Sequence, residues 1–242
     1  MKLYLILLMS MCLTAFARNE QKGDVQVQRH IRFWAGQMKE HAEFAANFAH
    51  DPALKKQGLE LSKRAQDAQN ANGADFLQLC SDLKSYQNKV YSDVKKHEEA
   101  NNNIKLDLLD HMNKETDYAQ KKAQGKRLTQ DEEARFWSEE HQGQAKAIAH
   151  FMKPNGMPLK QEAEQLEKSL NQPYMRATDK KMGTIEQANQ EIDTIGAQLE
   201  KDPSKTQMPQ KLAAHEKRER AYAREQLRGH KQLQTKSNRV RK

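Results

Sequence analysis

The sequence predicts an all-α protein that consists of two tandem antiparallel four-helix bundles, and three observations support this prediction. Residues that favour helices abound in the 242-residue chain, whereas helix breakers are scarce, with 10 glycines and 6 prolines. Apolar residues recur at helical spacing, and strand-like alternation is absent. Two landmark motifs each occur twice, roughly 100 residues apart, which indicates a tandem duplication.

The first landmark is Arg-Phe-Trp, which occupies 32–34 and recurs at 135–137. The second is His-x-x-x-Glu-x-x-Tyr-Ala, which occupies 111–119 and recurs at 215–223. The offsets, 103 and 104 residues, are nearly equal, so both landmarks indicate one repeat unit. The predicted organisation is a signal peptide at 1–17, a first bundle at 27–124, a second bundle at 130–229 and a basic tail at 230–242.

Helix breakers divide the first unit into four segments. The first helix is expected at 27–50, and Asp51-Pro52 begins the second, because Asp caps free amides and Pro suits the first turn. Asn72-Gly73 ends the second helix. The third and fourth helices are expected at 74–98 and 104–124, the latter closed by Gly125.

The second unit shows the same division. A capping box from Thr129 to Glu132 predicts a fifth helix that ends near Phe151. The sixth helix is expected to begin at Pro158, and the seventh to span 175–201. The eighth follows Pro209 and continues to about Gly229. Short connections between helices of this length predict antiparallel neighbours in each bundle.

The N-terminus predicts export. Met1–Ala17 combines a lysine, an apolar run and an Ala-Phe-Ala ending, which is typical of a secretory signal peptide cleaved near Ala17; a retained N-terminal anchor is the alternative. The mature protein is therefore expected to be secreted or periplasmic. Cleavage would leave Cys80 alone, so no internal disulfide is expected, and Cys80 is interpreted as a small core residue.

Positive charge gathers at the C-terminus. From Glu216 to Lys242 there are ten Lys or Arg residues against three Glu, although the whole chain carries only +8. Such a tail suits an anionic polymer or lipid, or simply a solvated helix end.

The repeated His-x-x-x-Glu predicts a metal site. On a helix, His111 and Glu115 share one face, and imidazole with carboxylate is a ligand pair that bundle cores use for iron, manganese or zinc. His41 lies on the apolar stripe of Trp34, so it is expected to face the same core. Glu40, Glu43, Asp93 or Glu98 are alternatives for a further ligand, and His97 competes with His41.

In the second unit, His215 and Glu219 repeat the pair. The position that matches His41 is Gln144, so His141, with Glu140 beside it, is the candidate for a shifted ligand. The alternative is a remnant kept for packing, and Tyr118 and Tyr222 are interpreted as packing residues.

The segments RFWAGQMKEHAEF at 32–44 and LLDHMNKETDYA at 108–119 resemble a bacterial family of unknown function with tandem ferritin-like four-helix bundles. The resemblance implies an inward metal site in each bundle, with His41, His111 and Glu115 in the first and His215 and Glu219 in the second. Gln144 departs from the family motif, which implies a degenerate second site.

Two functions follow from these predictions. The first is an exported metal-binding tandem bundle whose activity stays open, and the second is a non-enzymatic helical protein that binds an anionic partner through its basic tail. No glycine-rich phosphate loop and no Ser-His-Asp pattern occurs in the sequence.

Overall fold

The computed structural model describes residues 2–69, 73–98, 103–126, 128–170 and 178–240, of which 2–24, 130, 178–182 and 227–240 are described without their side chains. These residues form eight α-helices and no β-strand, which confirms the predicted all-α class. A single isolated bridge pairs Met152 with Thr206.

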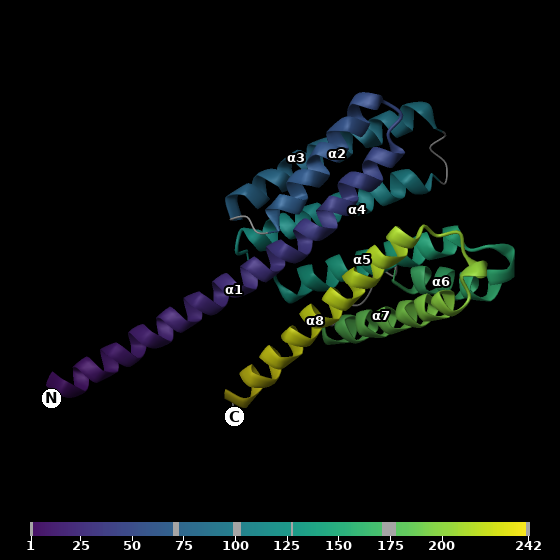
Figure 1. Cartoon of the computed structure of the whole chain (residues 1–242). Coiled ribbons are helices and arrows are strands. Elements are labelled where there is room, and N and C mark those ends of the chain that lie inside the picture. Colours follow the sequence, from purple (N-terminus) through teal and green to yellow (C-terminus); the bar gives the residue numbers. More distant parts are fainter. Residues whose placement is uncertain (1, 70–72, 99–102, 127, 171–177, 241–242) are drawn as a thin grey trace. The chain divides into compact units, whose positions relative to one another are not determined.

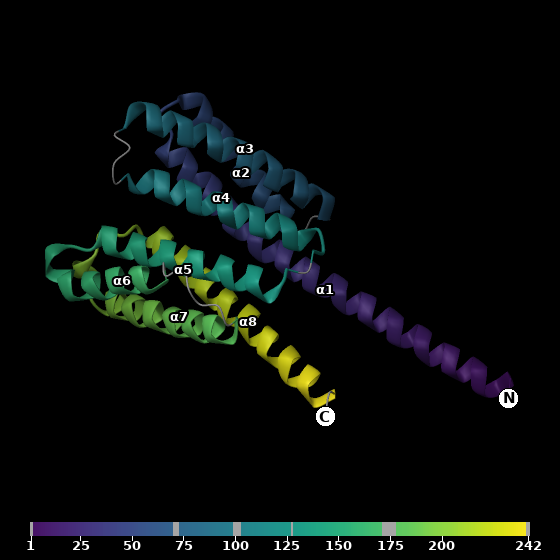
Figure 2. The same cartoon turned by 180° about the vertical axis from the view of Figure 1, so that it is seen from behind.

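The first four helices are α1 (Lys2–Phe48), α2 (Pro52–Ala68), α3 (Gly73–His97) and α4 (Ile104–Ala123). The last four are α5 (Gln130–Phe151), α6 (Met157–Leu170), α7 (Thr178–Lys201) and α8 (Gln210–Val240), with short 3-10 turns η1 (Pro154–Gly156) and η2 (Pro203–Lys205). Figures 1 and 2 show their course along the chain.

The chain divides into two compact units. Unit 1 comprises Met1–His97 and Thr116–Arg127, and unit 2 comprises Glu98–Glu115 and Leu128–Lys242. The first half of α4 therefore belongs to unit 2 and its second half to unit 1. The repeat boundary between 124 and 130 stays a prediction about the sequence.

Unit 1 is built from α1, α2 and α3 with the second half of α4, and α1–α3 pack lengthwise against one another (Figure 1). Gly58 permits close packing of α2, because a Cβ atom there would lie 2.7 Å from Ala46 Cβ and 2.8 Å from Tyr86 Cζ. Cys80 is buried, with its Sγ 3.8 Å from Met38 Sδ, and burial raises the pKa of its thiol to about 12. The interpretation of Cys80 as a core residue is confirmed.

Aromatic rings join α4 to α1 within unit 1. Trp34 is fully buried, and its ring centroid lies 5.7 Å from that of Tyr118. His30 Nε2 lies 3.2 Å from the carbonyl oxygen of Ala119. These contacts confirm the packing role predicted for Tyr118.

Unit 2 has its apolar core between α5, α6 and α7, where buried side chains of all three helices form one cluster. Its members are Ala145, Ile148, Ala149, Met152, Leu159, Ala163, Leu166, Leu170, Ala188, Ile192, Ile195 and Leu199. Trp137 is also buried, and its ring lies 6.2 Å from that of Tyr222 on α8. Burial of this apolar surface is the main stabilising contribution to the unit.

The predicted helix ends are confirmed where capping chemistry marked them. The Asp51 side chain accepts a hydrogen bond from the Ala53 amide at the start of α2. Thr129 and Glu132 form the expected capping box before α5. Gly125, with φ of 71°, follows α4 in the left-handed conformation that glycine favours.

No described helix has both the length and the hydropathy required to cross a bilayer. The signal peptide at 1–17 and the basic tail at 230–242 were both predicted on residues whose side chains the structure does not describe. Export and tail binding therefore stay predictions.

Candidate metal centre

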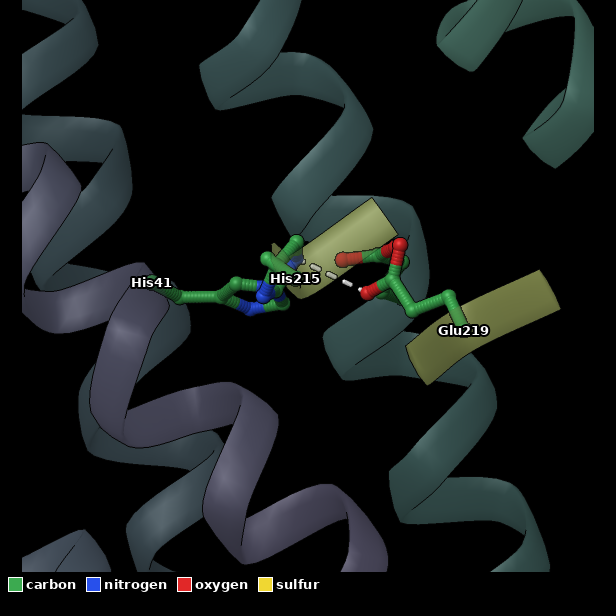
Figure 3. A group of neighbouring side chains, drawn as sticks. His41, His215 and Glu219 are labelled. Carbon is green, nitrogen blue, oxygen red and sulfur yellow. Dashed lines mark ion pairs between the residues drawn. The ribbon is translucent and has the colours of Figure 1, made fainter. Parts of the chain in front are cut away.

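Both copies of the His-x-x-x-Glu motif bring their two side chains together in unit 2. On α4, His111 Nε2 lies 3.4 Å from Glu115 Oε1. On α8, His215 Nε2 lies 2.8 Å from Glu219 Oε1, and Figure 3 shows these two side chains meeting. Residues i and i+4 share one helix face, so the spacing alone predicted each pair.

Glu140 on α5 supplies a third carboxylate, which our sequence analysis did not select as a ligand. Its Oε1 lies 2.9 Å from His111 Nε2. At the offset of 103 between the two Arg-Phe-Trp motifs, Glu140 matches Gln37, so the motif comparison predicted no carboxylate there. The usable signal was local, because Glu140 stands three residues after Trp137 and therefore shares the face of a buried tryptophan.

Four side chains from three helices converge. One ligand atom from each of His111, Glu115, Glu140 and Glu219 lies within 4.8 Å of all the others. The four side chains are 11%, 0%, 2% and 1% exposed, respectively. Glu115 and Glu219 also satisfy the same distance limit with His215. These buried His and Glu side chains could hold a metal ion; together they are called the His/Glu cluster below.

Gln144 supports two of these carboxylates. Its Nε2 donates to Glu219 Oε2 at 3.3 Å and to Glu140 Oε1 at 3.5 Å, and the side chain is fully buried. Gln144, which stands at the position matching His41, therefore orients carboxylates, as residues that hydrogen-bond to metal ligands often do.

Gly143 makes room for His111. A Cβ atom on Gly143 would lie 2.6 Å from His111 Nδ1 and 2.9 Å from its Cε1, closer than atoms in contact approach. Glycine inside a helix costs roughly 1 kcal/mol relative to alanine. The space that this glycine leaves is filled by the imidazole ring of the His/Glu cluster.

Burial and like charges perturb the titration of the cluster. Burial, with the carboxylates of Glu140 and Glu219, raises the pKa of Glu115 well above its usual value. Burial opposes protonation of His111, but the neighbouring carboxylates, Glu140 first, raise its pKa to about 9. Burial also opposes ionisation of Glu219, but His215 beside it lowers the pKa of that carboxyl. The cluster therefore holds protons that a divalent cation would displace.

His141, the ligand proposed for the second unit, lies outside the group of four. Its Nδ1 lies 2.5 Å from the carbonyl oxygen of Trp137, and its Nε2 lies 2.7 Å from Asn189 Oδ1. Both ring nitrogens thus have protein partners, and burial lowers the pKa of His141. Asn189 Nδ2 in turn lies 3.5 Å from the carbonyl oxygen of Arg220, so His141 helps to join α5, α7 and α8.

His41 is fully buried on α1 in unit 1, as its place on the stripe of Trp34 predicted. It stays a predicted ligand. Among the alternatives on α1, Glu43 accepts a hydrogen bond from Ser62 Oγ at 2.9 Å within the same unit.

The other proposed acids have structural roles. Asp93 Oδ2 accepts the backbone amides of His50 and Asp51 at 2.6 and 3.2 Å, and His97 Nδ1 lies 3.3 Å from Asp93 Oδ1. Glu98 pairs with Lys105 at the start of α4. These contacts account for Asp93, His97 and Glu98 without a metal.

The fold and the His/Glu cluster define an all-α protein with buried groups suited to a metal ion. No protein-family model matches the chain. No curated protein matches its sequence.

Proposed function

We propose that this protein is an exported metal-binding protein of tandem ferritin-like bundles, which holds a divalent ion with His111, Glu115, Glu140 and Glu219. The observation that carries the proposal is the convergence of their ligand atoms within 4.8 Å in a buried position. Buried carboxylates are costly unless they are paired or coordinate a metal. Three of them beside one imidazole favour a cation of charge two.

The donor set narrows the choice of ion. Carboxylate oxygen and imidazole nitrogen suit iron(II), manganese(II) and zinc(II), whereas the absence of thiolate from the four disfavours copper(I). Gly143 and Gln144 support the same proposal, since the first makes room for the imidazole and the second orients two carboxylates. Supporting groups of this kind accompany metal ligands in proteins.

The shared carboxylates allow one or two ions per chain. Glu115 and Glu219 lie within ligand distance of His111 and Glu140, and also of His215. Carboxylates placed between two imidazoles are able to bridge two ions, as in di-metal helical bundles. A stoichiometry near one or near two ions per chain distinguishes the two arrangements.

The test is metal analysis of the mature chain purified without chelators, before and after addition of iron(II), manganese(II) or zinc(II). We expect at least one tightly bound ion per chain and a raised unfolding temperature, because an ion that binds only the native state stabilises it. Less than a few tenths of an ion per chain under every condition would contradict the proposal. Glu140→Gln serves as the matched variant, with Glu164→Gln on α6 as its control.

Export is tested separately. N-terminal sequencing of protein recovered outside the cytoplasm should begin near Arg18, after the predicted cleavage at Ala17. A chain that retains Met1 would contradict export by this signal.

Binding of an anionic partner through the basic tail is the alternative function, and the five Lys and Arg residues of 230–242, which contains no acidic residue, favour it. A chain truncated after Gly229 should then lose binding to anionic vesicles or polymer and keep its metal content. Unchanged binding after truncation would exclude the tail as the docking element.

A further inference from the structure

A hollow of about 190 Å³ lies between α4 and α5 and reaches His111. Its wall includes four acidic residues and two lysines: Asp107, Asp110, Glu139, Glu167, Lys114 and Lys146. The hollow, called the access hollow below, lies wholly within unit 2.

The access hollow opens on the most accessible member of the His/Glu cluster. The His111 side chain is 11% exposed, whereas Glu115, Glu140 and Glu219 are at most 2% exposed. His111 is also the only one of these four that belongs to the wall of the hollow. An ion that comes from water through this hollow would therefore meet the imidazole first.

The charge of the wall suits a cation. Four carboxylates against two ammonium groups leave a formal charge of −2, and the wall stays negative, at −1, when the proton held by His111 is counted. Both lysines are held by acids of the wall: Lys114 Nζ lies 3.1 Å from Asp110 and 3.8 Å from Glu139, and Lys146 Nζ lies 2.8 Å from Asp107. These five side chains are 40–62% exposed, so water screens the ion pairs and their partners exchange readily.

We infer that the access hollow is the route by which a divalent cation reaches the His/Glu cluster. An arriving cation would displace the ammonium groups of Lys114 and Lys146 from the carboxylates with which they pair. This inference rests on the proposed function and adds the path to the site. Negative potential in a hollow raises the local concentration of cations and their association rate, most strongly at low ionic strength.

The first experiment measures association rates of Zn²⁺ alone with the metal-free mature chain by stopped-flow competition against a chromophoric chelator. The double variant Asp107→Asn/Asp110→Asn removes acids from the wall and should slow association by about tenfold at low ionic strength. Lys114→Gln removes a competing cation and should accelerate association by about threefold. Both effects should shrink as salt rises, because the charges are exposed.

The control variant also loses two negative charges, but at positions in unit 2 outside the access hollow. Glu162→Gln/Glu191→Gln changes two acids of a separate hollow between α6 and α7. Its association rate should stay within about twofold of the parent, because distant exposed charges are screened. Equal slowing by the control and by the double variant of the wall would show a net-charge effect and overturn the inference.

The second experiment blocks the route. Gln142 lies in the wall and outside the group of four ligands, so Gln142→Trp should fill the hollow and leave the ligands in place. A block on the path slows association and dissociation by the same factor, so both rates should fall by about tenfold or more at unchanged affinity. Gln165→Trp, in the hollow between α6 and α7, is the control and should change neither rate.

The outcomes separate the two proposals. If the parent chain binds no ion at equilibrium, the proposed function fails. If it binds an ion and Gln142→Trp, folded as judged by its melting curve, changes neither rate, the route fails and the metal centre stands. If Gln142→Trp misfolds, the charge variants alone decide, and rates unaffected by Asp107→Asn/Asp110→Asn and Lys114→Gln overturn the route.

Discussion

The segment around Trp34 on α1 and the segment around Trp137 on α5 have the same aromatic packing but different polar residues. Each tryptophan is buried against its preceding phenylalanine, with ring centroids 5.2 Å apart in α1 and 4.8 Å in α5. Each also packs against a tyrosine of the second landmark, at 5.7 Å for Tyr118 and 6.2 Å for Tyr222. The aromatic anchor is thus retained in both units.

The polar residues that follow each tryptophan differ. Three residues later, Gln37 corresponds to Glu140, and seven residues later His41 corresponds to Gln144. All four are buried. Because only the α5 copy places a carboxylate at the first position, the anchor determines which positions are buried and the individual residue determines the chemistry. A repeated aromatic anchor therefore does not imply repeated ligands.

The largest expected effect comes from making α5 resemble α1 at the first position. Glu140→Gln copies Gln37 and removes the carboxylate 2.9 Å from His111 Nε2. Metal affinity should fall by at least about 100-fold, since loss of a ligand exceeds the loss caused by a supporting group. Calorimetric titration with zinc measures it, and an affinity within threefold of the parent would remove Glu140 from the site.

Buried titratable groups in unit 1 and unit 2 should change the free energy of unfolding with pH in opposite directions. Burial lowers the pKa of His30 to about 4, despite its hydrogen bond to Ala119, so the folded state binds its proton less readily than the unfolded state. The contribution of His30 to the free energy of unfolding is therefore fully present above about pH 6.5 and is lost as pH falls toward 4. The free energy of unfolding should fall by on the order of 2 kcal/mol between pH 7 and pH 5. In unit 2 the raised pKa of Glu115 acts with the opposite sign, since that stability is lost as pH rises.

Denaturant unfolding of the metal-free chain at pH 7 and pH 5 measures this response. His30→Gln should lose less stability on acidification than the parent, because the buried imidazole is gone. Parallel losses in both proteins would show that His30 is already protonated in the folded state or accessible to water.

A smaller effect is expected at Gly143, where Gly143→Ala would push the imidazole of His111 out of position. Metal affinity should fall by about tenfold, less than for loss of a ligand, because the imidazole is shifted and not removed. Gly58→Ala in unit 1 is the matched control, since it also creates a steric conflict and should lower stability by about 1–3 kcal/mol with little change in metal affinity. Similar losses of affinity in both variants would mean that Gly143 acts only through stability.

The smallest effect is expected at Gly36 on α1, where an added Cβ would lie 3.8 Å from its nearest neighbour, Gln69 Nε2. Gly36→Ala should stabilise the chain by about 0.4–1 kcal/mol, because alanine reduces the freedom of the unfolded chain and favours helix. A thermal melt measures the gain. Destabilisation would indicate that α1 is more tightly packed at Gly36 than at ordinary contact distance.

Much of the fold and part of the candidate site followed from local rules. Capping at Asp51 and Thr129 depends on side chains next to the amides that they satisfy, so sequence spacing sufficed. The pairs on α4 and α8 followed from the same reasoning, because residues four apart on a helix are neighbours in any environment.

By itself, the sequence determined the all-α class, the capped starts of α2 and α5, and the faces on which His111, Glu115, His215 and Glu219 lie. The predicted start of the first helix at 27 and end of the eighth near Gly229 differ from the observed Lys2 and Val240. Only the tertiary structure decided that Glu140 pairs with His111, that Asn189 hydrogen-bonds to His141, and that Gly143 leaves room for the His111 imidazole. The physical reason is the short distance along the chain over which helical geometry predicts neighbours, which is about one turn. Partners on different helices depend on how those helices pack.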